Sequence, residues 1–192
     1  LTFGSGKDIP AGQSLARVLL GEDLQQEESG VRALYESALG QMEAYATGRF
    51  TAQLAQGAHP LAGQSEEAHA QALLEQMGLE VRFSSRQERL DGASVTFQQL
   101  WNGYPVFNCQ VTLIYQGEAL RELEGTLLPP QTSSSRQEET LTVPTLLVRF
   151  LSQRNESGQM FSQILSMTPG YRFSGSRPFT LTPVWHFSTD TG

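Results

Sequence analysis

The sequence predicts an α+β fold in which antiparallel strands outnumber isolated helices. Apolar and polar residues alternate along most of the chain, as in half-buried strands, and the pattern is clearest over residues 106–115. Glycine-containing turns separate these runs at short intervals. Few segments have apolar residues at helical spacing. We therefore expect two small sheets, each packed on a single helix.

The first elements are a helix followed by short strands. Apolar residues at helical spacing predict a helix over residues 13–26, and Ser29-Gly30 is expected to end it. Strands are predicted over 31–37, 41–46 and 49–55, with turns at glycines between them.

A second helix follows, with recognisable signals at both ends. Ser65 is the predicted N-cap, and the two glutamates after it suit the positive end of the helix dipole. Gly78 is predicted as the C-cap of this helix. A strand over 79–84 is expected to follow this helix.

The second half repeats this order. Strands are predicted over 94–101, 106–115 and 119–127, and residues 102–105 form a turn. The remaining predictions are a serine-rich linker over 129–138, a helix over 144–153 that starts at a proline, and strands over 160–173 and 179–188, the first of them split by Pro169-Gly170. The organisation predicted is an N-terminal helix and its lead-in over 1–29, a first sheet-helix unit over 30–90 and a second over 91–192.

Charge and cysteine content exclude some classes of protein. The formal net charge is -7, from 13 basic and 20 acidic side chains, which argues against nucleic acid as a partner. Cys109 is the single cysteine, so no intramolecular disulfide can form. It alternates with apolar residues, and we expect it to be buried and unreactive.

No catalytic, cofactor-binding or metal-binding constellation is recognisable in the sequence. The histidines His59, His69 and His186 do not occur at metal-ligand spacing, and none is paired with Cys109. We therefore expect no enzymatic activity, no cofactor and no metal.

Aromatic residues gather in the predicted hairpin over residues 101–115. Trp101, Tyr104 and Tyr115 are the candidates for a protein-interaction face, because aromatic side chains dominate such surfaces. Trp101 and Trp185 are also expected to reach the core.

The run 95–107, with the sequence VTFQQLWNGYPVF, resembles a strand-turn-strand signature of PepSY-like domains. It is most similar to that of the YycI family of regulators in Gram-positive bacteria. The hairpin over 111–125, Gly170-Tyr171 and the run 181–187 also fit, so the resemblance covers roughly residues 94–192. It implies a fold of tandem PepSY- or cystatin-like units, in which the second unit over 91–192 is the PepSY- or YycI-like one.

The resemblance also implies a function. Members of the YycI family are held at the extracytoplasmic face of the membrane by an N-terminal helix, which is not among these residues. They associate with a YycH-type sister regulator and with the sensor histidine kinase WalK, and they adjust signalling in cell-wall homeostasis. The same signature occurs in propeptides of secreted peptidases, so an inhibitory or chaperone-like module is the alternative. A third reading, an enzyme or ligand carrier, would require a pocket with converging polar groups.

Overall fold

The structure is a computed structural model that describes residues 2–3, 10–128, 150, 152, 163–175 and 179–190. The prediction of an α+β fold with antiparallel strands under isolated helices is confirmed. Helix α1 (Pro10–Leu20) precedes the meander β2 (Gln25–Ser29), β3 (Arg32–Ser37), β4 (Gly40–Tyr45) and β5 (Arg49–Leu54). Helix α2 (Glu66–Gln76) precedes the meander β7 (Val81–Arg89), β8 (Gly92–Trp101), β9 (Tyr104–Gln116) and β10 (Ala119–Thr126).

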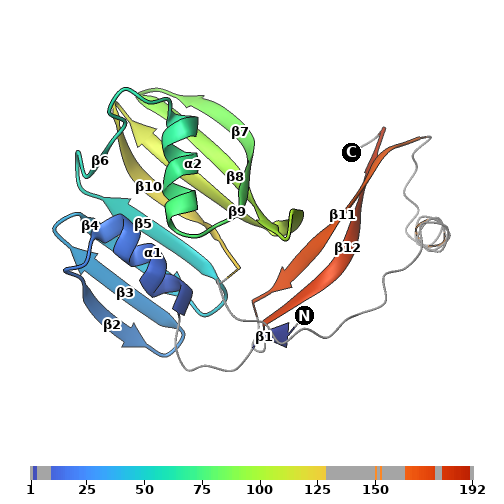
Figure 1. Cartoon of the computed structure of the whole chain (residues 1–192), viewed down its shortest axis with the longest axis horizontal. Coiled ribbons are helices and arrows are strands. Elements are labelled where there is room, and N and C mark those ends of the chain that lie inside the picture. Colours follow the sequence, from blue (N-terminus) through green and yellow to red (C-terminus); the bar gives the residue numbers. More distant parts are fainter. Residues whose placement is uncertain are drawn as a thin grey trace.

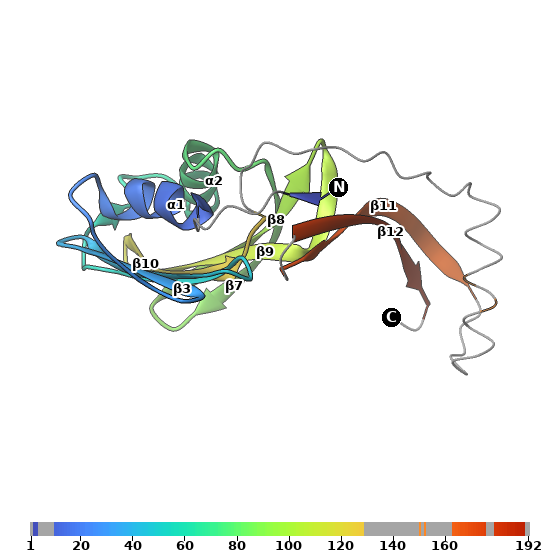
Figure 2. The ribbon, with the colours of Figure 1, turned by 90° about the horizontal axis from the view of Figure 1, so that it is seen from below.

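The two meanders join into one antiparallel sheet through their last strands. The order of the strands is β7–β8–β9–β10–β5–β4–β3–β2, and β5 pairs with β10 over Arg49–Gln53 and Glu122–Thr126. Both helices lie on the same face of this sheet (Figure 1, Figure 2). Helix α1 contacts β3, β4 and β5, whereas α2 contacts β7 and β8. A single hydrophobic core runs under both helices.

The remaining strands form a long hairpin beside this body. Strand β11 (Ile164–Ser174) pairs with β12 (Phe179–Thr189) in antiparallel fashion, and it meets β9 in a parallel bridge between Tyr171 and Val106. The short strand β1 (Thr2–Phe3) pairs with β12, and β6 (His59–Pro60) pairs with β10. The hairpin extends away from the body in both views (Figure 1, Figure 2).

The order of helix and sheet within each unit differs from the order expected from the sequence. Each helix precedes the strands that it covers, so the units span residues 10–54 and 66–126 rather than 30–90 and 91–192. A boundary after residue 29 would separate the paired strands β2 and β3, and one after residue 90 would separate β7 from β8.

Several element boundaries also differ from the predictions. Helix α1 ends at Leu20, because Gly21 has a φ of 83°, and residues 25–29 form the exposed strand β2 instead of continuing the helix. Strand β11 is not split at Pro169-Gly170, since β11 lies at the edge of the sheet there and edge strands accept proline. The predicted linker over 129–138 lies outside the described residues, as does the predicted helix over 144–153 apart from Phe150 and Ser152.

The N-cap predicted for α2 is confirmed, whereas the C-cap is Met77 and Gly78 is the residue after it. The hydroxyl of Ser65 accepts a hydrogen bond from the Ala68 N–H at 3.2 Å, and Gly78 follows the helix with a φ of 77°. Neither α1 nor α2 has the length and hydrophobicity that a membrane crossing requires.

Candidate protein-interaction site

The turn between β8 and β9 contains an irregularity that shapes the candidate site. Asn102 and Gly103 both have positive φ angles, of 51° and 79°, which is the geometry of a tight hairpin turn. Just before this turn the register of β8 and β9 shifts between Gln98 and Leu100. The buried Gln98 amide donates hydrogen bonds to the carbonyl oxygens of Val106 and Cys109, which the shift leaves without partners in β8.

Two further side-chain amides hold neighbouring segments in place. Gln99 Oε1 accepts a hydrogen bond from the Leu128 N–H at 2.7 Å, and Gln99 Nε2 donates to the Leu128 carbonyl at 3.1 Å. Asn108 Oδ1 accepts from the Phe173 N–H at 2.8 Å, and Asn108 Nδ2 donates to the Phe173 carbonyl at 2.7 Å. Each amide imitates the pairing of a neighbouring strand, so Asn108 attaches β11 to β9.

Glycines allow the hairpin to approach the body closely. A Cβ atom added at Gly170 would lie 2.5 Å from the Pro105 carbonyl oxygen and 2.6 Å from the Phe107 ring. One added at Gly175 would lie 2.3 Å from the carbonyl oxygen of Thr47, in the turn between β4 and β5. The base of the hairpin is therefore packed against both helix-sheet units.

One face of the β11–β12 hairpin is apolar over four consecutive cross-strand pairs. Cross-strand partners share a face, and the register places four apolar pairs on this one, here called the apolar stripe. The pairs are Phe173–Leu181, Tyr171–Pro183, Pro169–Trp185 and Met167–Phe187. The innermost pair is buried in a second hydrophobic cluster with Val106, Cys109 and Leu128.

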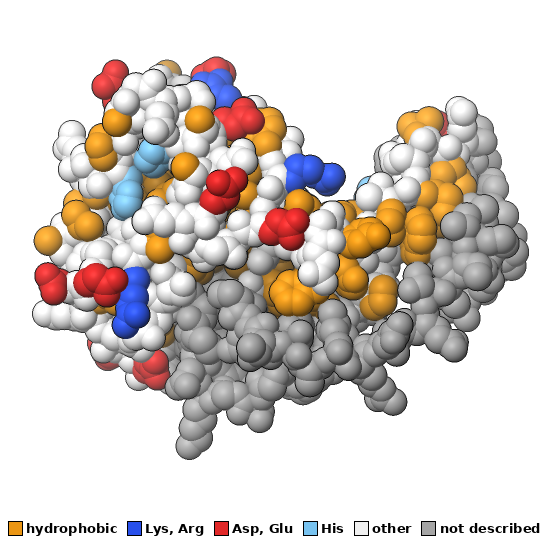
Figure 3. Space-filling model, viewed as in Figure 1, with side chains coloured by type: hydrophobic (Ala, Val, Ile, Leu, Met, Phe, Trp, Pro, Cys, Tyr) orange, Lys and Arg blue, Asp and Glu red, His pale blue; other side chains and the backbone are white. Residues whose placement is uncertain are grey.

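Beyond this buried pair the stripe opens into a groove. The aromatic groove, as we call it, has a volume of about 320 Å³, and its lining consists of Tyr104, Pro169, Gly170, Tyr171, Pro183, Val184 and Trp185. The rings of Tyr104 and Tyr171 meet edge to face, with centroids 6.3 Å apart. Hydrophobic side chains gather at this junction and along the hairpin (Figure 3).

The structure separates the residues that the sequence grouped as an interaction face. Tyr104 is 48% exposed and lines the aromatic groove. Trp101, its cross-strand partner, is half-buried and packs against the second cluster. Tyr115 is fully buried, because the alternation of β9 directs it into the core under α2, and it is no part of an exposed face. The expectation that Trp101 and Trp185 lie in the core is also wrong, since both are half-buried.

The sequence did not indicate that Tyr171, Pro183 and Trp185 form one surface with Tyr104. The alternation over 179–187 could be seen in the sequence. Which residues of the partner strand share a face with it could not, because Pro169-Gly170 suggested that the strand is interrupted. Continuous pairing of β11 with β12 would have placed these residues on one face.

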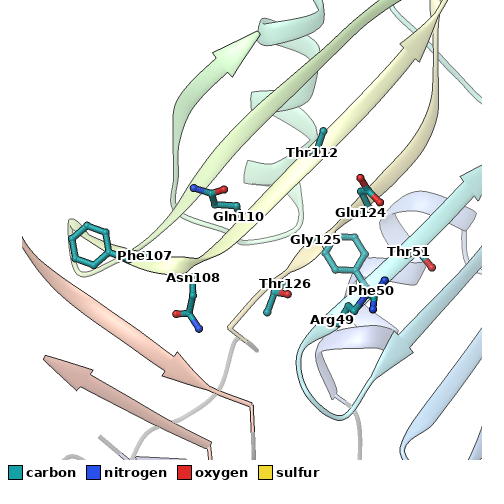
Figure 4. A pocket seen from close by; sticks show the side chains of 10 residues that line it. All are labelled: Arg49, Phe50, Thr51, Phe107, Asn108, Gln110, Thr112, Glu124, Gly125 and Thr126. Atoms are coloured by element: carbon teal, nitrogen blue, oxygen red, sulfur yellow. The ribbon is translucent and has the colours of Figure 1, made fainter. Parts of the chain in front are cut away.

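The open face of the sheet has a different character. A polar depression of about 310 Å³ lies across β5, β10 and β9, and polar side chains such as Arg49, Gln110, Thr112 and Glu124 line it (Figure 4). Its amides already have partners, since Gln110 donates to Gln98 at 3.1 Å and Asn108 binds Phe173. The depression therefore resembles the solvated face of an antiparallel sheet.

Titratable groups under the helices have structural partners. His69 Nδ1 and the Tyr115 hydroxyl share a hydrogen bond of 2.9 Å, and His59 Nε2 lies 2.8 Å from the Leu19 carbonyl oxygen at the end of α1. Burial raises the pKa of the Tyr115 hydroxyl and raises that of the Cys109 thiol to about 12. Among the described residues, no group of histidine, cysteine and carboxylate side chains is placed to hold a metal ion.

A comparison with solved structures finds a likeness to a known protein. No protein-family model matches the chain, and no curated protein matches it either. Among solved structures, the chain is similar to the Bacillus megaterium YpeB C-terminal domain, with a TM-score of 0.42 and 10% sequence identity. The alignment covers 97% of this chain and 88% of that one.

Proposed function

We propose that this chain is a non-enzymatic domain that binds another protein, and that the aromatic groove is its binding site. The observation that supports this proposal is the gathering of Tyr104, Tyr171 and Trp185 around one groove whose base is rigidly held. Tyrosine and tryptophan are enriched among the residues that contribute most binding energy in protein interfaces. The groove also contains Pro169 and Pro183, whose φ angles are fixed by the ring, so they lose less backbone freedom than other residues when a partner binds.

The rigidity of the base favours binding. The Asn108 amide and the close packing of Gly170 and Gly175 fix β11 before any partner arrives. A preorganised surface loses less conformational entropy on association, so more of the burial free energy becomes affinity. The groove therefore suits an extended or helical segment that presents apolar side chains.

We propose further that the partner is a membrane sensor histidine kinase of the WalK type, or a sister regulator of the YycH type, at the extracytoplasmic face of the membrane. The support for this finer assignment is the resemblance of residues 94–192 to the YycI family. The residues of this motif also have a physical role beside the groove. Gln98 and Gln99 hold the backbone near the β8–β9 turn by hydrogen bonds, and Asn102-Gly103 form the turn that precedes Tyr104.

The test is binding of the purified chain to the extracytoplasmic domain of the kinase, with two groove variants. Tyr104→Ser and Trp185→Ser should each weaken binding by about ten-fold or more, the effect expected for truncation of an interface anchor. Leu90→Ser is the matched control, because Leu90 is fully exposed and lies in the turn between β7 and β8, at the other end of β8 from Tyr104. Equal binding by all three variants would exclude the groove as the binding site.

The same variants separate the alternative function. If the chain inhibits a secreted peptidase and does not bind the kinase, the inhibitory-module reading replaces the regulatory one. Loss of inhibition in Trp185→Ser would then still identify the groove as the site.

A further inference from the structure

The apolar stripe continues beyond the aromatic groove. The pair Met167–Phe187 extends it toward the outer end of the hairpin, and both side chains are only half-exposed although β11 pairs with the body at Tyr171. A two-stranded hairpin that projects from a domain needs something packed on its apolar face to be stable. Burial at this distance from the body therefore requires a second contact.

Phe150 provides this contact. Its ring stacks on that of Phe187, with centroids 4.0 Å apart and planes only 6° from parallel. Phe150 is itself half-buried and has helical backbone geometry. In the sequence it belongs to a set of apolar residues at helical spacing, Leu146, Leu147, Phe150 and Leu151.

We propose that Phe150 is an intramolecular occupant of the outer end of the apolar stripe, and that a partner that follows the stripe past Trp185 must displace it. This inference rests on the proposed function of the aromatic groove and adds a regulation to it. Because the outer end of the stripe binds the aromatic ring of Phe150, the partner segment that fits best presents an aromatic side chain to Phe187, the residue of the stripe that follows Trp185.

The energetics suit a displaceable contact. An aromatic pair contributes about 0.5–1.5 kcal/mol beyond the burial of its surface, which corresponds to about two- to twelve-fold in an equilibrium constant. A contact of this size can be exchanged for an equivalent aromatic contact from a partner at little net cost. Removing Phe150 should therefore improve binding of a competing aromatic segment.

The experiment uses the whole chain and a labelled synthetic peptide with the sequence of residues 144–153, so it needs no knowledge of the natural partner. Fluorescence anisotropy measures binding of the peptide to the wild-type protein and to the variant Phe150→Ala. We expect the variant to bind the peptide about three- to ten-fold more tightly, because its outer end is no longer occupied. A peptide with alanine in place of Phe150 should bind more weakly than the native peptide by a similar factor.

Two control variants test whether the peptide binds at the outer end of the apolar stripe. Phe187→Leu in the Phe150→Ala background should reduce binding, whereas Phe83→Leu, at another partly exposed phenylalanine, should not. Equal affinity of the wild-type and Phe150→Ala proteins, or indifference to the phenylalanine of the peptide, would overturn the inference. The comparison of the native peptide with the alanine-containing peptide uses proteins in which Phe187 is unaltered. A folding defect in Phe187→Leu therefore leaves the test decisive. Failure of the kinase to bind would contradict the proposed function and leave this result unchanged.

Discussion

At the scale of single residues, the structure explains the composition of the motif over residues 97–103. Phe97 is fully buried under α2, whereas Gln98 and Gln99 are buried polar residues whose amides satisfy backbone groups. Such groups would otherwise carry a desolvation penalty. Phe97, Gln98 and Gln99 therefore each have a structural role beside the β8–β9 turn that presents Tyr104.

The thiol of Cys109 is expected to be unreactive in the folded protein. Burial raises its pKa from 9.0 to about 12, so almost no thiolate is present at pH 8. A thiol reagent such as Ellman's reagent should react with Cys109 only after the chain is unfolded in urea. Rapid labelling of the native protein would show that the second hydrophobic cluster opens readily.

His69 should make the stability of the fold depend on pH. Burial lowers its pKa below 6.5, and the nearby charge of His59 acts in the same direction. The unfolded chain therefore binds this proton more readily than the folded protein does. The stabilisation from a neutral His69 is complete above pH 6.5 and is lost as the pH falls through the folded-state pKa.

Urea unfolding at pH 7.5 and pH 5.5 measures this effect. The wild-type protein should lose more free energy of unfolding between these values than His69→Gln, in which this position cannot titrate. An equal loss in both proteins would assign the acid sensitivity to other groups.

Burial predicts different costs for truncating two large aromatic side chains. Phe97 is fully buried, so Phe97→Ala should reduce the free energy of unfolding by about 3–5 kcal/mol. Trp185→Ala should cost clearly less, because Trp185 is only half-buried on the hairpin. Urea unfolding of both variants checks the order; a larger cost for Trp185 would show that the hairpin is integral to the core.

At the scale of elements, the sequence predicted some features better than others. Strands β3, β4, β5, β8, β9 and β10 lie where alternation predicted them, and the N-cap of α2 was correctly assigned to Ser65. The polar strand β2 was missed, because its residues QQEES are all exposed and show no alternation. An exposed edge strand is specified by its paired neighbour rather than by its own apolar pattern.

The candidate site could be predicted only in part, for the same reason. Tyr104 was recognised as a surface aromatic residue of a turn, but its partner Tyr171 comes from a strand far away in the sequence. The contact depends on the parallel bridge between β9 and β11 and on the Asn108 amide. Neither leaves a periodic signal in the sequence.

Asn108 should control the docking of the hairpin. Asn108→Ala removes both hydrogen bonds to Phe173 and leaves its backbone groups without this partner, which should cost about 1–3 kcal/mol. Hydrogen exchange should become faster in residues 164–174 and stay unchanged in β3 and β4. Asn108→Asp retains the acceptor for the Phe173 N–H but places a carboxylate oxygen against the Phe173 carbonyl, so it should also make exchange faster; wild-type exchange in both variants would contradict this role.

At the scale of the whole molecule, the chain has the organisation of a dimer within one polypeptide. Each unit is a helix followed by a meander, and the units meet antiparallel through their last strands with both helices on one face (Figure 2). This is the arrangement that a two-fold axis between β5 and β10 would produce. The hairpin breaks the symmetry, since Asn108 and the irregular start of β9 belong to the second unit alone.

The joint between the units should make them unfold together. Phe50 lies opposite Gly125 across the β5–β10 joint, and its side chain is buried in the core that both helices share. Phe50→Ala should therefore reduce the free energy of unfolding by about 3–5 kcal/mol. In native-state hydrogen exchange, β4 and β8 should show equal decreases in protection, although they belong to different units. A decrease confined to β4 would mean that the first unit opens alone. The two units would then unfold independently although they share one hydrophobic core.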